Sequence, residues 1–136
     1  MLNKWHIAYM KAAHLFADLS SAERLKVGAI IVKDGRIISI GYNGTPSGWD
    51  NTCEQDDVTK PEVIHAEANA ISKLARSTES GRGAEMYLSH SPCVECAKLI
   101  YASGIVRVFY QTTYRSDAGI EFLRDCGVRI TKTEET

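Results

Sequence analysis

The first twenty residues have the periodicity of an amphipathic helix. Apolar residues recur mostly three or four positions apart until Ser20-Ser21 interrupt them: Trp5, Ala8, Ala12, Leu15, Phe16 and Leu19. Two short runs rich in β-branched and other apolar residues follow, 27–32 and 37–42, and each predicts a strand. Because Asp34-Gly35 lies between the two runs, they predict a tight antiparallel hairpin.

Helical and strand patterns alternate in the second half of the chain. Helices are predicted from His65 to the Ser-Gly-Arg-Gly stretch at 80–83, from Ser91-Pro92 to Gly104, and over 118–126. Pro near a first helical position and Gly just past a last one are typical of helix ends. Strands are predicted at 86–88, 105–110 and 128–131. The polar segment 43–62 holds two glycines and two prolines, and a loop of this length is usually functional or disordered.

The order α-β-β-α-β-α-β-α-β predicts the α/β class. Helices that alternate with strands imply right-handed crossovers and a parallel part of the sheet, whereas the hairpin supplies an antiparallel part. We therefore expect a three-layer α/β/α fold with a mixed five-stranded sheet and helices on both faces. The 136 residues suit one domain spanning 1–136. The helices beginning near 65 and 92 should start at one end of the sheet, where α/β ligand sites form.

Composition narrows the classes of partner. The formal net charge is −1, and no basic stripe of the kind that holds nucleic acid is evident. A small ligand is therefore expected rather than nucleic acid. No apolar run approaches the roughly 20 residues of a membrane span, and the N-terminus lacks the apolar region of a signal peptide. These features predict a cytoplasmic protein with no membrane partner.

The chain has four cysteines: Cys53, Cys93, Cys96 and Cys126. Because a reducing compartment disfavours disulfides, the close pair Cys93 and Cys96 indicates a metal or redox site. A Cys-x-x-Cys pair alone is also compatible with half a zinc finger, for which Cys53 offers a fourth ligand in the long loop. A thioredoxin-type redox pair is a further alternative. Cys126, at the end of a predicted helix, is interpreted as a small buried hydrophobic residue.

His65-Ala66-Glu67 and Pro92-Cys93-Val94-Glu95-Cys96 together point to metal chemistry. One imidazole and two thiolates provide three ligands, and catalytic zinc sites leave the fourth position to a water that the metal acidifies. The three-residue spacing puts Cys93 and Cys96 on one helical face, and a helix N-terminus favours the thiolate. Glu67 need not bind metal and is placed to carry protons. A redox pair would leave His65 and Glu67 unexplained.

The pattern H-x-E…P-C-x-x-C is the signature of zinc-dependent nucleobase deaminases, in which the Glu is acid and base rather than ligand. From Trp5 to about Thr131 the chain resembles the cytidine and deoxycytidylate deaminase family, through 27–31, 41–48, 65–71 and 91–98. The Gly-Tyr-Asn-Gly-x-Pro-x-Gly loop at 41–48 is similar to the deoxycytidylate members rather than to nucleoside or tRNA deaminases. The resemblance implies a cytidine deaminase-like fold.

The resemblance also implies a reaction and the roles of six residues. The family's reaction would be hydrolysis of dCMP to dUMP and ammonia, which feeds dTMP synthesis in pyrimidine nucleotide biosynthesis. One catalytic Zn²⁺ per subunit would be held by His65, Cys93 and Cys96, and Glu67 would shuttle protons. Asn43 would hydrogen-bond the sugar, although an Asn here also serves simply to cap a turn. The backbone carbonyl near Ser91 would receive the leaving amino group.

A nucleotide substrate needs a phosphate site, for which Arg115, the hydroxyl of Tyr114 and Lys26 are candidates. Many family members are homohexamers activated by dCTP and inhibited by dTTP, and Mg²⁺ would accompany a triphosphate effector. Effector or subunit contacts are assigned by resemblance to Lys26, Gly44 and Arg76. Each charge is equally compatible with an ordinary solvated surface.

Two further functional hypotheses stay open at this level. The site would suit a deaminase of cytidine, guanine or tRNA adenosine. It would also suit a non-enzymatic nucleotide binder in which zinc is structural. Some phage members carry a second zinc, but no Cys lies near Ala22 to help Cys53 bind one. We therefore expect Cys53 to be a free thiol.

Overall fold

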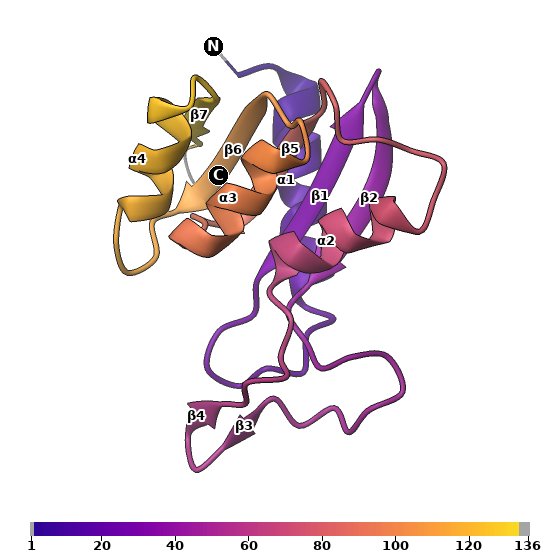
Figure 1. Cartoon of the computed structure of the whole chain (residues 1–136), viewed down its shortest axis with the longest axis vertical. Helices are drawn as coiled ribbons and strands as arrows, with labels where there is room; N and C mark the ends of the chain where they lie inside the picture. The colour runs from indigo at the N-terminus through magenta and orange to yellow at the C-terminus, as the bar shows by residue number, and fades with distance from the viewer. Residues whose placement is uncertain (1, 134–136) are drawn as a thin grey trace.

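The computed structural model describes residues 2–133 and contains the predicted mixed sheet (Figure 1). The five strands lie in the order β2-β1-β5-β6-β7. Strand β1 pairs antiparallel with both β2 and β5, whereas β5, β6 and β7 are parallel. The antiparallel part therefore extends one strand beyond the hairpin. The strand bounds are β1 Gly28–Lys33, β2 Arg36–Tyr42, β5 Glu85–His90, β6 Arg107–Thr112 and β7 Arg129–Lys132.

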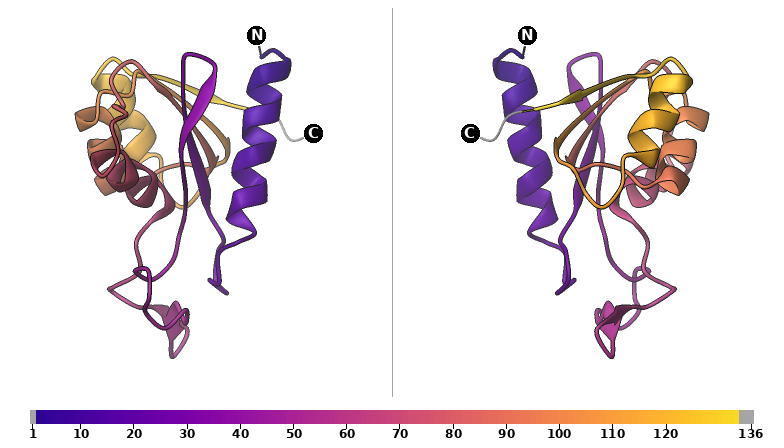
Figure 2. Two further views of the ribbon diagram at one scale, coloured as in Figure 1. Left: turned by 90° about the vertical axis from the view of Figure 1, so that its right-hand side faces the viewer. Right: turned by 90° about the vertical axis from the view of Figure 1, so that its left-hand side faces the viewer.

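Helices cover both faces of the sheet, which confirms the three-layer prediction. Helix α1 (Lys4–Ala17) lies on one face, and α2 (Ala66–Ala75), α3 (Val94–Ala102) and α4 (Ala118–Asp125) lie on the other (Figure 2). Within the described residues, no helix has the length and apolar character needed to cross a bilayer.

Strand β1 is buried on both faces, and this explains its continuous apolar run. Ala29 and Ile31 join the core under α2, α3 and α4, whereas Ile30 and Val32 pack toward α1 with Tyr87 and Phe109. Alternate residues of one strand thus supply two cores.

The predicted tight turn joins β1 to β2. Asp34 and Gly35 both have left-handed backbones, with φ of 52° and 72°. Positive φ at both central residues is the mark of a type I′ turn, whose twist matches that of the flanking strands.

Three glycines let helix backbones approach closely. A Cβ at Gly28 would lie 2.0 Å from the carbonyl oxygen of Ala13 in α1. A Cβ at Gly41 would lie 2.3 Å from the carbonyl oxygen of Ala66, at the start of α2. A Cβ at Gly119 in α4 would lie 2.2 Å from the carbonyl oxygen of Pro92, just before α3. Backbone contacts therefore fix where α2 and α3 begin.

The long loop contains a small hairpin that the sequence patterns do not predict. Strands β3 (Glu54–Gln55) and β4 (Val58–Thr59) pair antiparallel, beyond the end of the main sheet (Figure 1). Asp56 and Asp57 form its turn with φ of 54° and 63°. The loop returns to the fold through a bridge in which Gly44 and Ile64 exchange two backbone hydrogen bonds.

Candidate active site

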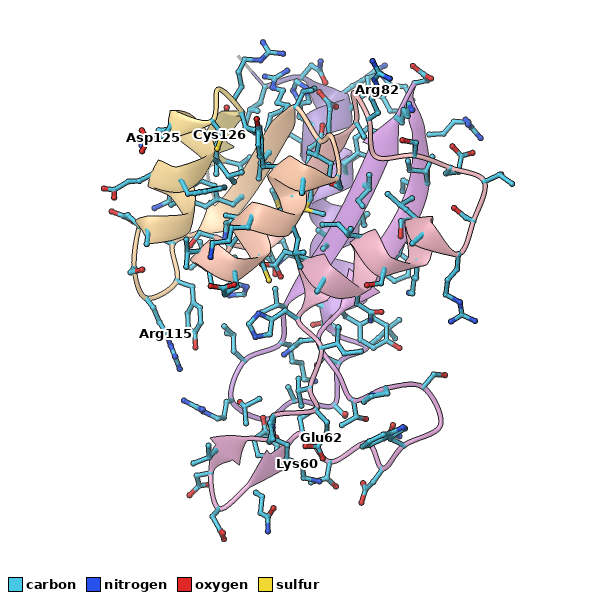
Figure 3. The ribbon with its side chains drawn as sticks, in the orientation of Figure 1. Lys60, Glu62, Arg82, Arg115, Asp125 and Cys126 are labelled. Carbon is cyan, nitrogen blue, oxygen red and sulfur yellow. The ribbon has the colours of Figure 1, made fainter. Side chains whose placement is uncertain are left out.

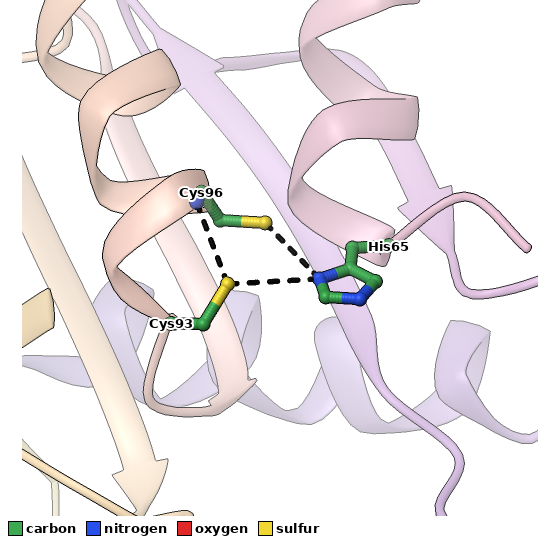
Figure 4. Close-up of side chains that lie close together, drawn as sticks. All are labelled: His65, Cys93 and Cys96. Atoms are coloured by element: carbon green, nitrogen blue, oxygen red, sulfur yellow. Dashed lines mark hydrogen bonds between the residues drawn. The ribbon is translucent and has the colours of Figure 1, made fainter. Parts of the chain in front are cut away.

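The predicted metal ligands meet where two helices begin. His65 is the N-cap of α2 and Cys93 the N-cap of α3, and Cys96 lies in the first turn of α3 (Figure 4). The long loop delivers His65, whereas β5 and the Ser91-Pro92 turn deliver the cysteines. As predicted, the two helix starts lie together, although 28 residues separate His65 from Cys93.

The three side chains have the spacing of a zinc site. His65 Nδ1 lies 3.3 Å from Cys96 Sγ and 3.7 Å from Cys93 Sγ, and all ligand atoms lie within 4.8 Å of one another. A nitrogen and a sulfur on one tetrahedral zinc ion, at about 2.1 and 2.3 Å from the metal, lie about 3.6 Å apart. The observed distances bracket this value. His65 and Cys93 are open to solvent and Cys96 is buried, so the donor set fits zinc with one side accessible.

The electrostatics of the metal-free cluster favour one thiolate first. Hydrogen bonds from the Cys96 side chain and from His65 lower the pKa of Cys93 to about 3. The Cys96 backbone N–H also lies 3.5 Å from Cys93 Sγ. The hydrogen bond to the Cys93 thiolate, followed by burial, raises the pKa of Cys96. A divalent cation would stabilise the second thiolate as well, because coordinating thiols are deprotonated.

Glu67 is buried beside the three ligands, at 4% exposure. It occupies the first turn of α2, two residues after His65. Burial raises the pKa of its carboxyl group to about 7. A carboxyl group that titrates near neutral pH exchanges protons readily in both directions, as a general acid and base must.

A cavity of about 520 Å³ opens over this cluster. Its lining includes His65, Glu67 and Cys93, and also the predicted substrate residues Asn43, Ser91, Tyr114 and Arg115. A larger cavity of about 770 Å³ lies along α1, on the other face of the sheet, and includes none of these residues. The smaller cavity is therefore the candidate active site, because it contains the metal ligands and Glu67.

The side chain of Asn43 is anchored to the backbone before β1. Its Oδ1 accepts a hydrogen bond from Val27 N at 2.8 Å, and its Nδ2 donates one to Leu25 O at 2.8 Å. Its own carbonyl accepts a bond from Ser20 Oγ at 2.7 Å. Asn43 therefore holds one cavity wall together, and its amide keeps one N–H and one lone pair for a ligand.

A second wall consists of Ser91, Tyr114 and Arg115. The Ser91 hydroxyl oxygen accepts a hydrogen bond from Tyr114 N at 2.8 Å, which ties the loop before α4 to the end of β5. The Arg115 guanidinium lies 5.0 Å from the Tyr114 ring centroid. The Arg115 backbone is left-handed, with φ of 58°. Figure 3 shows Arg115 extending from this loop toward the side on which the β3–β4 hairpin lies.

Of the remaining predicted residues, Cys53 is part of the cavity lining, whereas Lys26, Gly44, Arg76 and Cys126 lie outside it. Lys26 and Arg76 are exposed, and Gly44 takes part in the bridge to Ile64. Cys53 forms no disulfide within the described residues; it is buried, and its sulfur lies 3.6 Å from Ser21 Oγ. Cys126 caps α4 and is half-buried, so the prediction of a buried residue was wrong in degree.

Arg24 and His90 are among the polar residues of the cavity lining that sequence patterns missed. Arg24 precedes β1 in a segment whose backbone N–H groups at 23 and 24 donate to the Glu54 carboxylate. His90 ends β5 immediately before Ser91-Pro92-Cys93. Its position at a strand end, directly before a ligand motif, is the sequence feature that could have identified it.

Comparisons with known proteins agree with this geometry. The profile of the cytidine and deoxycytidylate deaminase zinc-binding region matches residues 3–112. Deoxycytidylate deaminase of Enterobacteria phage T4 is 34% identical, covering 89% of this chain and 86% of its own. The Homo sapiens deoxycytidylate deaminase is 38% identical, with coverage of 85% and 68%. The crystal structure of dCMP deaminase from cyanophage S-TIM5 with dCMP and dUMP superposes with a TM-score of 0.95 at 47% identity, covering 98% of this chain and 99% of that one.

Proposed function

The chain belongs to the cytidine and deoxycytidylate deaminase family, and we propose that it hydrolyses dCMP to dUMP and ammonia with one zinc ion per subunit. One observation carries the proposal: His65, Cys93 and Cys96 converge beside the buried carboxyl group of Glu67 in one cavity. Relatives named deoxycytidylate deaminase, and a close structural neighbour solved with dCMP and dUMP, support this substrate.

A zinc ion on His65 Nδ1 and the two cysteine sulfurs would supply the Lewis acidity that makes water a nucleophile at neutral pH. Glu67 takes one proton from the attacking water and delivers it to N3 of cytosine. It then carries the second proton of that water to the amino group, which departs as ammonia. Burial raises the pKa of this carboxyl group above its ordinary value, which favours a group that can release as well as accept a proton. The backbone carbonyl at Ser91 accepts a hydrogen bond from the departing amino group.

The two walls of the cavity bind the rest of the nucleotide in this proposal. The remaining N–H of the Asn43 amide donates to a sugar hydroxyl. Arg115 and the Tyr114 hydroxyl bind the phosphate, for which a planar guanidinium is well shaped. The stack of Arg115 on the Tyr114 ring places both groups on one side of the cavity.

Purified protein with one zinc ion per chain should release dUMP and ammonia from dCMP. Glu67→Gln should lower kcat by about a hundredfold or more, the scale of lost acid–base catalysis, and should keep zinc and bind dUMP. Glu121→Gln, the same change at an exposed site on α4, is the matched control.

Absence of turnover by the zinc-loaded wild-type chain, with or without dCTP, would overturn the proposal. A preference for cytidine or for an adenosine-bearing tRNA would overturn the substrate assignment. Retained activity in Glu67→Gln would refute the proton shuttle.

The family resemblance also supports proposals about regulation. We propose a cytoplasmic homohexamer that dCTP, with Mg²⁺, activates and dTTP inhibits, and whose product feeds dTMP synthesis. Lys26, Gly44 and Arg76 lie outside the catalytic cavity, as effector or subunit contacts would. Sedimentation with each nucleotide tests the assembly. Unchanged kinetics with either triphosphate would refute the regulation.

A further inference from the structure

His90 is a polar residue of the catalytic cavity to which the reaction above gives no role. It is half-buried, and it lines the cavity at the end of β5. The side chain is not part of the ligand cluster of His65, Cys93 and Cys96. Because the ring lines the cavity, its nitrogens are candidates for hydrogen bonds to a ligand.

A chain of hydrogen bonds favours one nitrogen of His90 as the site of the ring proton. Ser89 Oγ lies 2.9 Å from Gly28 N and 2.9 Å from His90 Nδ1. The backbone N–H of Gly28 can only donate, so Ser89 Oγ accepts there and has its hydroxyl proton available for Nδ1. Donation of that buried hydroxyl proton to Nδ1 satisfies both groups and favours the tautomer with the ring proton on Nε2. Ser89 is fully buried, so water does not compete for these bonds.

The neutral form of the ring is favoured by its surroundings. Burial, followed by the nearby His14, lowers the pKa of His90. Among the described residues, no side chain or backbone group is bonded to Nε2. The ring therefore keeps one fixed N–H donor for another acceptor.

Three side chains form a row of contacts in the lining of the catalytic cavity. The His90 and Tyr114 rings meet edge to face, with centroids 6.3 Å apart. The Arg115 guanidinium lies over the Tyr114 ring. A cytosine nucleotide with its reacting carbon beside Glu67 must extend its sugar and phosphate elsewhere in the cavity. The row of His90, Tyr114 and Arg115 provides donors along that path.

We propose that His90 contacts the substrate, its Nε2–H donating a hydrogen bond to an oxygen of the sugar–phosphate half of the nucleotide. This inference rests on the proposed deamination of dCMP. It assigns His90 a role in binding and not in proton transfer. Its loss should therefore raise KM much more than it lowers kcat.

Two amide variants separate the two ring nitrogens. The amide of His90→Gln reaches the region of Nε2, whereas the shorter amide of His90→Asn stays near Nδ1 and its Ser89 partner. Loss of one hydrogen bond should raise KM for dCMP about tenfold in His90→Asn and His90→Leu, with kcat within about twofold of wild type. His90→Gln should recover most of the affinity.

Deoxycytidine, which lacks the phosphate, identifies the acceptor. If the variants lose kcat/KM on dCMP alone, the acceptor is a phosphate oxygen. If they lose it on both substrates, the acceptor belongs to the sugar. Either result supports the contact. A KM within twofold of wild type for both His90→Asn and His90→Leu would overturn it, as would a Gln variant no better than Leu.

Imidazole nitrogen NMR tests the contact in the wild-type chain, so the inference does not depend on how well the variants fold. The Nε2–H tautomer should be observed for His90, and its resonance should shift when dUMP is added. The opposite tautomer, or no shift at saturation, would overturn the inference. An inactive wild-type chain would instead contradict the proposed function.

Discussion

Gly119→Ala should damage the metal site through the backbone at the start of α3. An added Cβ would lie 2.2 Å from Pro92 O and 2.9 Å from Cys93 O. Both are backbone atoms at the start of α3, so no rotamer change relieves the clash. The two segments must separate by about 1 Å to restore ordinary contact, an overpacking that costs about 1–3 kcal/mol. Zinc ligand distances tolerate only about 0.2 Å.

We therefore expect Gly119→Ala to weaken zinc binding at least tenfold, measured by chelator competition, and to unfold at lower denaturant. Gly127→Ala is the matched control at the end of the same helix. Its φ of 84° makes Ala strained, but an added Cβ there has open space. The control should lose about 1 kcal/mol of stability and keep its zinc affinity. Equal zinc affinity in the two variants would refute the reasoning.

Three further predictions follow from the site. In metal-free protein the raised pKa of Glu67 gives stability that is present below the ordinary value of 4.5 and lost as pH rises to about 7. Glu67→Gln should therefore be more stable than wild type by about 3 kcal/mol above pH 7 and equally stable at pH 4. Equal denaturant midpoints of variant and wild type at both pH values would contradict this. Asn43→Ala removes the hydrogen bonds to Val27 N and Leu25 O and should lower the free energy of unfolding by about 1–3 kcal/mol. Asn43→Asp, which keeps the acceptor, should recover part of that loss. An Ala variant as stable as wild type would contradict the anchoring role of Asn43. Cys53→Ser should keep one zinc ion per chain by elemental analysis, and a fall below wild-type zinc content would give Cys53 a metal role.

The elements of the main sheet were predictable because their patterns are long enough to show a period. The run 27–32 is apolar throughout, as a strand buried on both faces requires. The β3–β4 hairpin was not predictable, because two-residue strands have no measurable alternation. Its one local indication is the pair Asp56-Asp57, since Asp tolerates left-handed backbones better than most residues.

The chemistry of the site was predictable to different depths. His65, Glu67 and the cysteines stand at fixed short spacings at helix starts, so sequence alone specifies their grouping. The anchoring of Asn43 depends on backbone groups that lie 16 and 18 residues away. The tautomer of His90 likewise depends on Gly28, which reaches Ser89 only through the folded sheet. Contacts of this kind leave no local pattern.

The glycine contacts of the β1–β2 hairpin have a mechanical consequence. Gly28 touches the end of α1 and Gly41 the start of α2, from opposite faces of two paired strands. Backbone atoms make the closest approach of both helix layers at this end, and one of these layers begins with the metal ligand His65. A side chain larger than hydrogen at Gly28 or Gly41 should therefore push a helix layer away from the sheet, and at Gly41 it should displace the start of α2 together with His65.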